Sequence, residues 1–290
     1  MGDVITDVVA RHGSALVHGT DAAALISTVP GGAGANVACW AARSGCRDVR
    51  LVARVGADSA AWHERVLRRA GVRPLLAVDD EAPTGTVVAL VDAAAERTFL
   101  TDSGAVLRLS PADWSPSMLD GIAHLHLSGY LLFAATSRAT ARVVLREATR
   151  RNVPVSVDPA SAGFLSGFGV DAFLAAVAGA ELLLPNADEA RLLTGLAEPA
   201  EAAAELSLLF PQVVVTLGEM GALLAAGGAV TGQAPAVAVR GPVDTTGAGD
   251  AFTGGFLAAR LAGADDAAAA AAGCLAGAEA VTTVGGRPAG

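Results

Sequence analysis

The chain has 290 residues, with 20 Lys or Arg against 29 Asp or Glu and a formal net charge of -9. This acidic balance argues against nucleic acid or an anionic membrane as a partner, because both require a basic protein face. All twenty of the Lys-or-Arg residues are Arg, which excludes a lysine-dependent phosphate loop, a pyridoxal Schiff base and an SxxK nucleophile.

Two segments in the first third of the chain, residues 8–29 and 84–101, alternate apolar and polar positions between turn signals. The alternation predicts short strands, and the stretch VDAAAERTF at 91–99 is typical of a hairpin connection. We expect the two segments to pair as a small sheet beside the main domain. Because they flank the glycine-rich stretch PGGAGAN at 30–36, we expect this sheet to cover a pocket as a lid.

The stretch GGAGAN at 31–36 precedes an apolar helical pattern at 37–44. As a dinucleotide-binding signal it is weak, because Val37 follows where a further glycine is expected and Pro30 interrupts the preceding strand. A tight turn at a helix start is an equally good interpretation. If the loop binds a ligand, Asn36 faces inward at the helix start and can hydrogen-bond a substrate hydroxyl.

From residue 119 onward, short apolar runs alternate with helical patterns. We predict strands at 122–127, 153–157, 180–184 and 213–217, with helices at 138–150, 171–178, 187–194 and 201–208. This order indicates right-handed βαβ units and a parallel sheet. His124 and His126 alternate on the first strand, and we interpret them as buried or edge residues because two histidines are too few for a zinc site.

Two predicted strands end in polar segments. Asn186 and Glu189 follow the third strand three positions apart, so they can converge on a ligand or a hydrated metal. A capping box made by the same two residues is the simpler alternative. The segment TLGEMG at 216–221 ends the fourth strand, where open α/β sheets bind ligands, and an ordinary turn is its alternative.

The stretch DTTGAGDAF at 244–252 precedes a long Ala-rich helical pattern. Gly247 and Gly249 let the backbone curl without side chains that block a ligand, and a helix start attracts anions. Asp250 then lies beside the exposed N–H groups. For this motif alone, a helix cap is the alternative role of Asp250.

In combination and order, these four motifs resemble the ribokinase-like (PfkB) carbohydrate kinase family over nearly the whole chain. The Arg97-Thr98-Phe99 and Asp158-Pro159 segments also look like this family. The resemblance implies one α/β domain over residues 1–290, a three-layer αβα sandwich with a mostly parallel central sheet and a small β-sheet lid. It implies an ATP-dependent kinase that phosphorylates a primary hydroxyl of a sugar or a sugar-containing small molecule by in-line transfer.

The resemblance also assigns roles to matching positions. It implies that Asp250 is the general base and that the backbone amides of Gly247, Ala248 and Gly249 form the anion hole. It places Mg²⁺ near Asn186 and Glu189 through water. The implied nucleotide contacts are Asn186, Glu189, Thr216, Gly218, Gly221 and Thr245; the implied acceptor contacts are Asp7, Gly31, Gly32 and Asn36. A K⁺ site is implied at Asp244, Thr246, Ala280, Thr283 and Gly285.

The sequence departs from ribokinase itself in two acceptor positions. Ile5 stands where ribokinase has a polar Asn, and Ala33 stands where it has Lys. Both changes remove polar contacts, which favours an acceptor with a larger, partly flat group, such as the nucleoside pseudouridine. Relatives also carry a strand before the Gly2-Asp3 step, so either translation begins upstream or the sheet lacks its first strand. In the second case we expect Asp7 to be poorly anchored.

Two further interpretations belong to other classes. An NAD-dependent oxidoreductase fails on the missing third glycine and on the lack of a strand-terminal acid about twenty residues later. A non-catalytic sugar- or nucleotide-sensing protein is disfavoured by the intact Asp250 and glycine turn. Cys39, Cys46 and Cys274 form no CxxC pair, which indicates a reduced cytoplasmic protein, and we expect no membrane partner. Lid sheets often pair between subunits in the family that this sequence resembles, so the resemblance implies a homodimer through the lid sheet.

Overall fold

The computed structural model describes residues 1–92 and 97–289, and its largest sheet has six strands in the order β12-β11-β10-β9-β8-β7. Strands β7 to β10 are mutually parallel, whereas β11 and β12 are antiparallel additions at one edge. The bounds of the strands are β7 Leu125–Ser128, β8 Val155–Asp158, β9 Leu182–Leu183, β10 Gln212–Thr216, β11 Ala222–Ala226 and β12 Ala229–Ala234.

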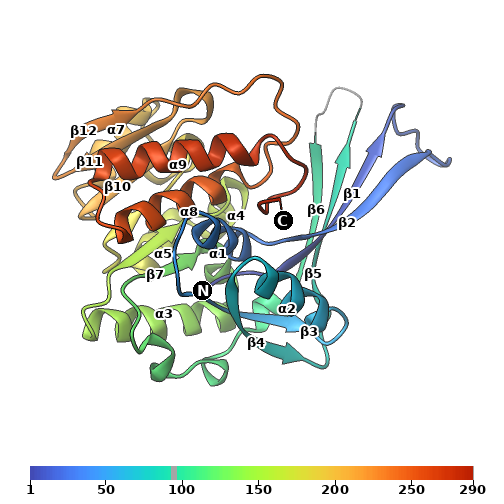
Figure 1. The fold of residues 1–290 in the computed structure, drawn as a ribbon, viewed down its shortest axis with the longest axis horizontal. Coiled ribbons are helices and arrows are strands. Elements are labelled where there is room, and N and C mark those ends of the chain that lie inside the picture. Colours follow the sequence, from blue (N-terminus) through green and yellow to red (C-terminus); the bar gives the residue numbers. More distant parts are fainter. Residues whose placement is uncertain (93–96, 290) are drawn as a thin grey trace.

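Helices cover both faces of this sheet, which makes three layers (Figure 1). The burial of alternate strand residues shows that both faces are covered. Leu183 and Val213 pack in one buried cluster, whereas their neighbours Leu182 and Val214 pack in another. The first cluster includes residues of α3, α5, α6 and α7, and the second includes residues of α8 and α9. The bounds of these helices are α3 Ala135–Arg150, α5 Val170–Val177, α6 Ala187–Thr194, α7 Pro199–Leu206, α8 Ala248–Leu261 and α9 Asp266–Ala280.

A second unit carries a parallel pair of strands, β3 (Val49–Gly56) and β4 (Val72–Asp79), with helices α1 (Ala33–Arg43) and α2 (Ala60–Arg69). Its strand β3 faces β7 of the six-stranded sheet across a seam. Met1 and Gly2 span one end of the seam: the Gly2 N–H donates to the Val52 carbonyl at 3.1 Å, and the Ser128 N–H donates to the Met1 carbonyl at 3.0 Å. The rest of the seam borders a cavity of about 320 Å³, which is lined by residues of β3, β7 and α1 among others.

A four-stranded sheet in the order β2-β1-β5-β6 projects from these two units (Figure 1). Its strands are β1 Ile5–His12, β2 Ala24–Gly31, β5 Thr84–Val91 and β6 Arg97–Gly104. Strands β5 and β6 pair antiparallel as a hairpin, and residues 93–96 of the predicted connection lie outside the described residues. Asp7 is paired on both sides, with Val29 and with Val87, so it is held within the ladder and not poorly anchored.

The predicted helices and strands of the second half are all present; the helix predicted at 187–194 is α6 at both ends, and the ends of the others are shifted. The strand predicted at 122–127 is β7, which begins only at Leu125, and the helix predicted at 138–150 is α3, which begins earlier, at Ala135. A seven-residue helix, α4 (Ala162–Phe168), follows β8 and was not predicted. Among the described residues, no helix is both long and apolar enough to cross a membrane.

Candidate active site

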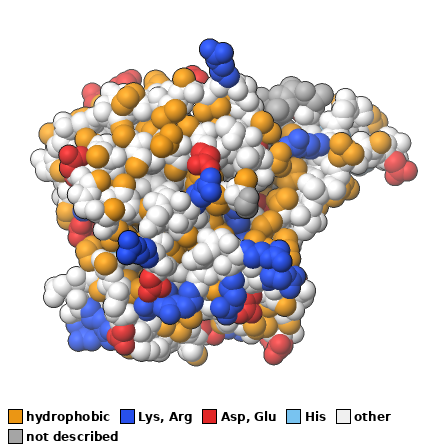
Figure 2. All heavy atoms as spheres, in the orientation of Figure 1, with side chains coloured by type: hydrophobic (Ala, Val, Ile, Leu, Met, Phe, Trp, Pro, Cys, Tyr) orange, Lys and Arg blue, Asp and Glu red, His pale blue; other side chains and the backbone are white. Residues whose placement is uncertain are grey.

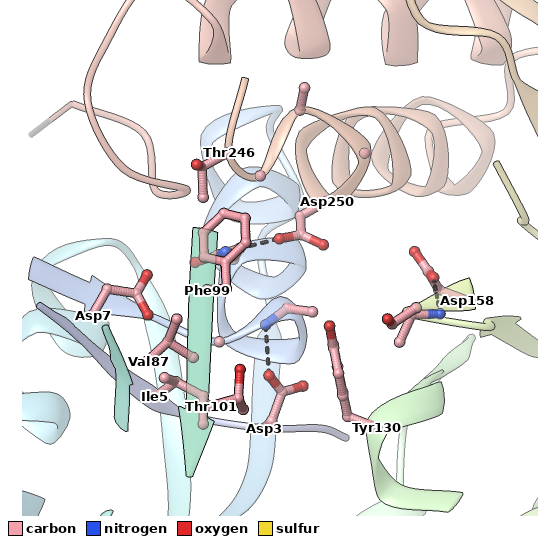
Figure 3. A pocket seen from close by; sticks show the side chains of 18 of the residues that line it. Asp3, Ile5, Asp7, Val87, Phe99, Thr101, Tyr130, Asp158, Thr246 and Asp250 are labelled. Carbon is pink, nitrogen blue, oxygen red and sulfur yellow. Dashed lines mark hydrogen bonds between the residues drawn. The ribbon is translucent and has the colours of Figure 1, made fainter. Parts of the chain in front are cut away.

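One cavity of about 670 Å³ collects most of the predicted site residues (Figure 3). It lies where β7 to β10 end, between the start of α8 and the four-stranded sheet. The predicted residues that line it are Asp7, Gly32, Asn36, Asn186, Glu189, Thr216, Asp244, Thr245, Thr246, Gly247, Ala248, Gly249, Asp250 and Gly285. Gly31, Gly218, Gly221, Ala280 and Thr283 lie outside this lining.

The start of α8 presents open backbone donors to the cavity. Gly247 is the N-cap in the left-handed conformation, with φ of 74°, and a Cβ there would collide with the backbone of Gly286. The N–H groups of Gly247, Gly249 and Asp250 donate no hydrogen bond to any described residue, whereas the Ala248 N–H makes a 3.3 Å turn bond to Thr245. Unpaired N–H groups at a helix start form a site for an anion.

Gly249 has a different reason to be glycine. A Cβ built on it would meet no protein atom within 4 Å, and its φ lies outside the left-handed region. The folded chain by itself therefore does not require glycine at this position. The space that a side chain would occupy belongs to the cavity, which fits a ligand that approaches the backbone closely.

Asp250 lies in the first turn of α8 and is oriented by α1. The Asn36 side-chain N–H donates to an Asp250 carboxylate oxygen at 2.8 Å, which joins residues 214 positions apart (Figure 3). The Asn36 Oδ1 is buried and has no hydrogen-bond partner among the described residues. Burial raises the pKa of Asp250 well above its ordinary value, and the nearby Asp158 raises it further, against the hydrogen bond from Asn36.

Two more carboxyl groups, Asp158 at the end of β8 and Glu189 in α6, line the cavity. Burial raises the pKa of Glu189 and the charge of Asp158 adds to that effect, while burial also raises the pKa of Asp158. Like charges held close together out of water favour protonation or a bound cation. Among the described residues that line the cavity, none is Lys or Arg.

The capping box predicted as the alternative role of Asn186 and Glu189 is present. The Glu189 N–H donates to Asn186 Oδ1 at 2.9 Å, and the Asn186 N–H donates to Glu189 Oε2 at 2.9 Å. Asn186 is therefore the N-cap of α6, and β10 is fixed beside it because the Thr216 N–H bonds the Pro185 carbonyl at 3.0 Å. The box engages one carboxylate oxygen of Glu189, which leaves the other oxygen for a hydrated cation.

The loop before α8 is tied to the chain's last described segment through Asp244. The buried Asp244 carboxylate accepts from the Thr246 N–H at 2.7 Å and from the Gly285 N–H at 3.0 Å. The backbone of Asp244 also bonds the Val281 carbonyl at 3.3 Å. The structure thus brings together the two segments of the predicted K⁺ site, although the Ala280 carbonyl already accepts from the Thr283 N–H at 3.2 Å.

The glycines at 31 and 32 make room for their neighbours. A Cβ on Gly31 would collide with the Asp7 carboxylate, and Gly32 combines φ of 96° with close contact to the backbone of β1. Burial raises the pKa of Asp7 to about 7, and the Arg287 guanidinium opposes this shift. At neutral pH Asp7 is therefore close to the midpoint of its titration. Its protonated form can donate a hydrogen bond to a ligand hydroxyl, and its ionised form can accept one.

Several lining residues were not predicted. Asp3 accepts from the Ala33 N–H at 2.7 Å and the Gly34 N–H at 3.0 Å, and so holds the first turn of α1 in place. Tyr130 projects into the cavity from the turn after β7, and Phe99 projects from β6 (Figure 3). A usable signal existed for Tyr130, because it lies within three residues of the end of a predicted strand, at the sheet edge where ligands bind.

Comparison with known proteins places this geometry in context. A family model described as pfkB family carbohydrate kinase matches residues 1–289. A fructokinase from Klebsiella pneumoniae is 33% identical over 241 residues, which cover 79% of this chain and 76% of that protein. The structure of adenosine kinase from Sinorhizobium meliloti has a TM-score of 0.90 at 22% identity and covers 99% of this chain and 94% of its own. A structure from E. coli that contains ATP and Mg²⁺ has a TM-score of 0.85 at 24% identity, covering 98% and 92%. These structures confirm the predicted three-layer fold.

Proposed function

The chain belongs to the pfkB family of carbohydrate kinases, and we propose that it transfers the γ-phosphate of ATP to a primary hydroxyl with Asp250 as general base. That it is an ATP-dependent phosphotransferase acting on an alcohol group of a sugar or nucleoside follows from the family. The observation that carries the residue assignment is the position of Asp250 beside the open N–H groups of α8, within one cavity.

In the proposed mechanism, the Asp250 carboxylate accepts the proton of the acceptor hydroxyl as its oxygen attacks the γ-phosphorus. Asn36 positions the carboxylate through its 2.8 Å hydrogen bond. A raised pKa makes Asp250 a stronger base than an ordinary carboxylate once it is ionised, which suits proton transfer near neutral pH. The amides of Gly247, Ala248 and Gly249 stabilise the negative charge on the phosphoryl oxygens.

We propose that hydrated Mg²⁺ binds at the part of the cavity that is lined by Asp158 and Glu189. Asp158 and Glu189 place two carboxylates with raised pKa values where no cationic side chain lines the cavity in the described part of the chain. Oxygen ligands of this kind suit hydrated Mg²⁺, which neutralises phosphate charge when it is bound. Glu189 and Asn186 would hold it through water, since the capping box already fixes both side chains.

We also propose a monovalent cation at Asp244, with carbonyl groups from Thr246, Ala280, Thr283 and Gly285. The convergence of the 244–246 loop with residues 280–285 supports this site. The test is turnover in K⁺ compared with a large inert cation at equal ionic strength. Equal rates in the two salts would remove the proposal.

For the acceptor, a nucleoside is favoured by the walls of the cavity. The four-stranded sheet presents Ile5, Val87 and Phe99 to it, and Tyr130 lies across the cavity from them (Figure 3). Phe164 packs against Tyr130 and also lines the cavity. Apolar and aromatic walls suit a flat base better than a small free sugar, whose hydroxyls need polar partners. Asp7 and the unpartnered Asn36 Oδ1 remain available for ribose hydroxyls.

The test of the proposed function is ADP release with ribose, fructose, 2-keto-3-deoxygluconate, adenosine and pseudouridine as acceptors. We expect turnover above the acceptor-free rate, with the highest kcat/KM for a nucleoside. Turnover best with a free sugar would overturn the nucleoside assignment alone. Binding of every compound without ADP release would instead favour a sensing protein and overturn the kinase assignment.

We further propose a homodimer through the four-stranded sheet, which would serve as a lid over the cavity. Strand β2 is the outer strand of that sheet, and its Leu25 and Ile26 are 79% and 69% exposed. Apolar side chains are visible along this projecting sheet in Figure 2. Sedimentation of the wild type and of Ile26→Asp tests the dimer, and two monomeric species would contradict it. The three free cysteines are in keeping with a reduced cytoplasmic setting.

A further inference from the structure

Tyr130 is the single tyrosine of the chain, and the mechanism above gives it no role. It lies in the short turn Gly129–Leu132 directly after β7, which delivers its side chain to the cavity at the carboxyl ends of the strands. Figure 3 shows its ring on the opposite side of Asp3 from Asp7 and Ile5. The hydroxyl points toward the space between Asp250 and Asp158.

The ring of Tyr130 is fixed by direct packing on Phe133 and Phe164, and these three residues form an aromatic cluster. It packs edge-on against Phe133, with centroids 6.1 Å apart at 84°, and against Phe164, at 5.7 Å and 78°. Phe133 in turn stacks on Phe164 at 5.4 Å. Edge-to-face packing on two sides restricts rotation of the ring, so the hydroxyl is held at a defined point in the cavity.

The hydroxyl is a donor without a partner. The structure gives it no hydrogen bond to any described residue, although the side chain is only partly exposed. Burial raises the pKa of Tyr130, and the charges of Asp3 and Asp250 add to the effect, so the group stays protonated at neutral pH. A carboxylate can only accept hydrogen bonds once it is ionised, so Tyr130 is a neutral donor beside groups that become acceptors when they lose their protons.

The position of this donor points to one group of the reacting system. In the function proposed above, on which this inference rests, Asp250 marks the acceptor oxygen and Asp158 with Glu189 marks the side of the hydrated cation. The phosphoryl group passes between them. We propose that the Tyr130 hydroxyl donates a hydrogen bond to an oxygen of this phosphoryl group during transfer, from the wall facing the amides of α8. The described lining holds no Lys or Arg that could do so.

Tyr130→Phe tests this directly, because it removes one oxygen and keeps the ring in the cluster. We expect kcat to fall at least ~10-fold, which is less than the loss of an oxyanion-hole donor typically causes. The KM values for acceptor and ATP should stay within about twofold of the wild-type values. The packing control is Phe168→Leu, since Phe168 contacts Phe133 at 5.9 Å and does not line the cavity. It should lower Tm and leave kcat unchanged.

Two kinetic results would overturn the proposal. One is an unchanged kcat in Tyr130→Phe. The other is a raised acceptor KM at unchanged kcat, which would mean that the hydroxyl binds the acceptor in its ground state and makes no special contact with the phosphoryl group.

A second measurement does not depend on turnover. Because the chain has one tyrosine, ¹³Cζ labelling gives a single tyrosine resonance. We expect it to shift when Mg·ADP is converted to Mg·ADP·AlF₄⁻, which mimics the phosphoryl group in transfer, and not when Mg·ADP alone is added. Absence of the AlF₄⁻-dependent shift would overturn the proposal, even for a protein that phosphorylates no compound of the acceptor panel. Failure of the proposed function would appear only in the acceptor panel, so the two failures are distinguishable.

Discussion

At the scale of single residues, Asp250 is the side chain on which the proposed chemistry depends. Asp250→Asn keeps the shape and can still accept the Asn36 hydrogen bond, so we expect the fold and ATP binding to persist. It cannot take up a proton, so kcat should fall at least ~10²-fold, the scale of general-base effects. Steady-state kinetics and calorimetric titration with ATP measure the two quantities. Near-normal kcat in the variant would remove Asp250 from its role.

Gly247 and Gly249 make a matched pair, because one is required by the fold and the other is not. Gly247→Ala should lower the free energy of unfolding by about 1–2 kcal/mol or more, since φ is 74° and Gly286 occupies the space. Gly249→Ala should raise it by about 0.5 kcal/mol, because the site is helical and open. We expect kcat/KM for ATP to fall in both. Urea unfolding checks the contrast, and full activity in Gly249→Ala would argue against a phosphate at this backbone.

Asp7 links the acceptor site to stability through pH. Its folded-state pKa is raised to about 7, so the folded protein binds this proton more tightly than the unfolded chain does. The stability contributed by the neutral acid is present below its unfolded pKa and is lost as the pH rises through about 7. The Tm of Asp7→Asn minus the Tm of the wild type should therefore increase as the pH is raised from 5 to 8. Other titrating groups are common to both proteins, and a difference that is constant with pH would contradict the shift.

The sequence predicted the site residues that belong to motifs and left out those that stand alone. Asp250 and its glycines come as one contiguous signature, because a helix start must be built from neighbouring residues. Tyr130 and Asp3 carry no such spacing, since tertiary packing alone brings them to Asp250. The apolar wall was predicted only as strand alternation, because alternation does not tell which face of a strand is covered.

At the scale of an element, the start of α6 carries a structural and a proposed chemical role in the same two residues. Asn186→Ala removes the cap and should cost about 1 kcal/mol of unfolding free energy. Asn186→Ser keeps a capping oxygen and should stay within about 0.5 kcal/mol of wild type. Both lose the amide that we place near the hydrated cation, so both should raise the Mg²⁺ concentration needed for half-maximal rate. An Asn186→Ser enzyme with wild-type Mg²⁺ dependence would leave Asn186 as a cap only.

Element types in the second half of the chain were predictable, and element ends were not. Apolar runs between helical patterns identify β7 to β10 correctly, because parallel strands buried on both faces need continuous apolar residues. Strand ends depend on where a neighbour's backbone stops pairing. Strand β9 has two ladder residues whereas the prediction spans 180–184, although the Glu181 and Leu184 N–H groups still bond carbonyls of Val155 and Val157.

At the scale of the whole molecule, the cavity gathers three acidic side chains whose charged forms are disfavoured by burial. Asp158, Glu189 and Asp250 all have raised pKa values, and burial is the main cause in each case. Binding of Mg²⁺ to the folded state should therefore raise Tm, by more than an equal ionic strength of a monovalent salt does. Asp158→Asn should reduce this increment in a thermal scan with MgCl₂. An identical increment in that variant would place the divalent ion elsewhere.

The seam between β3 and β7 determines where local unfolding of the native protein is expected to begin. Strands β8 and β9 are hydrogen-bonded on both sides, whereas β3 and β7 each have one strand neighbour in the described chain and are linked by backbone hydrogen bonds of Met1 and Gly2. Native-state deuterium uptake should therefore begin along this line, with amides of β3 and β7 losing protection at lower denaturant than those of β8 and β9. Since the projecting sheet continues from the β3 side and the six-stranded sheet from the β7 side, such an opening would part the two halves of the cavity.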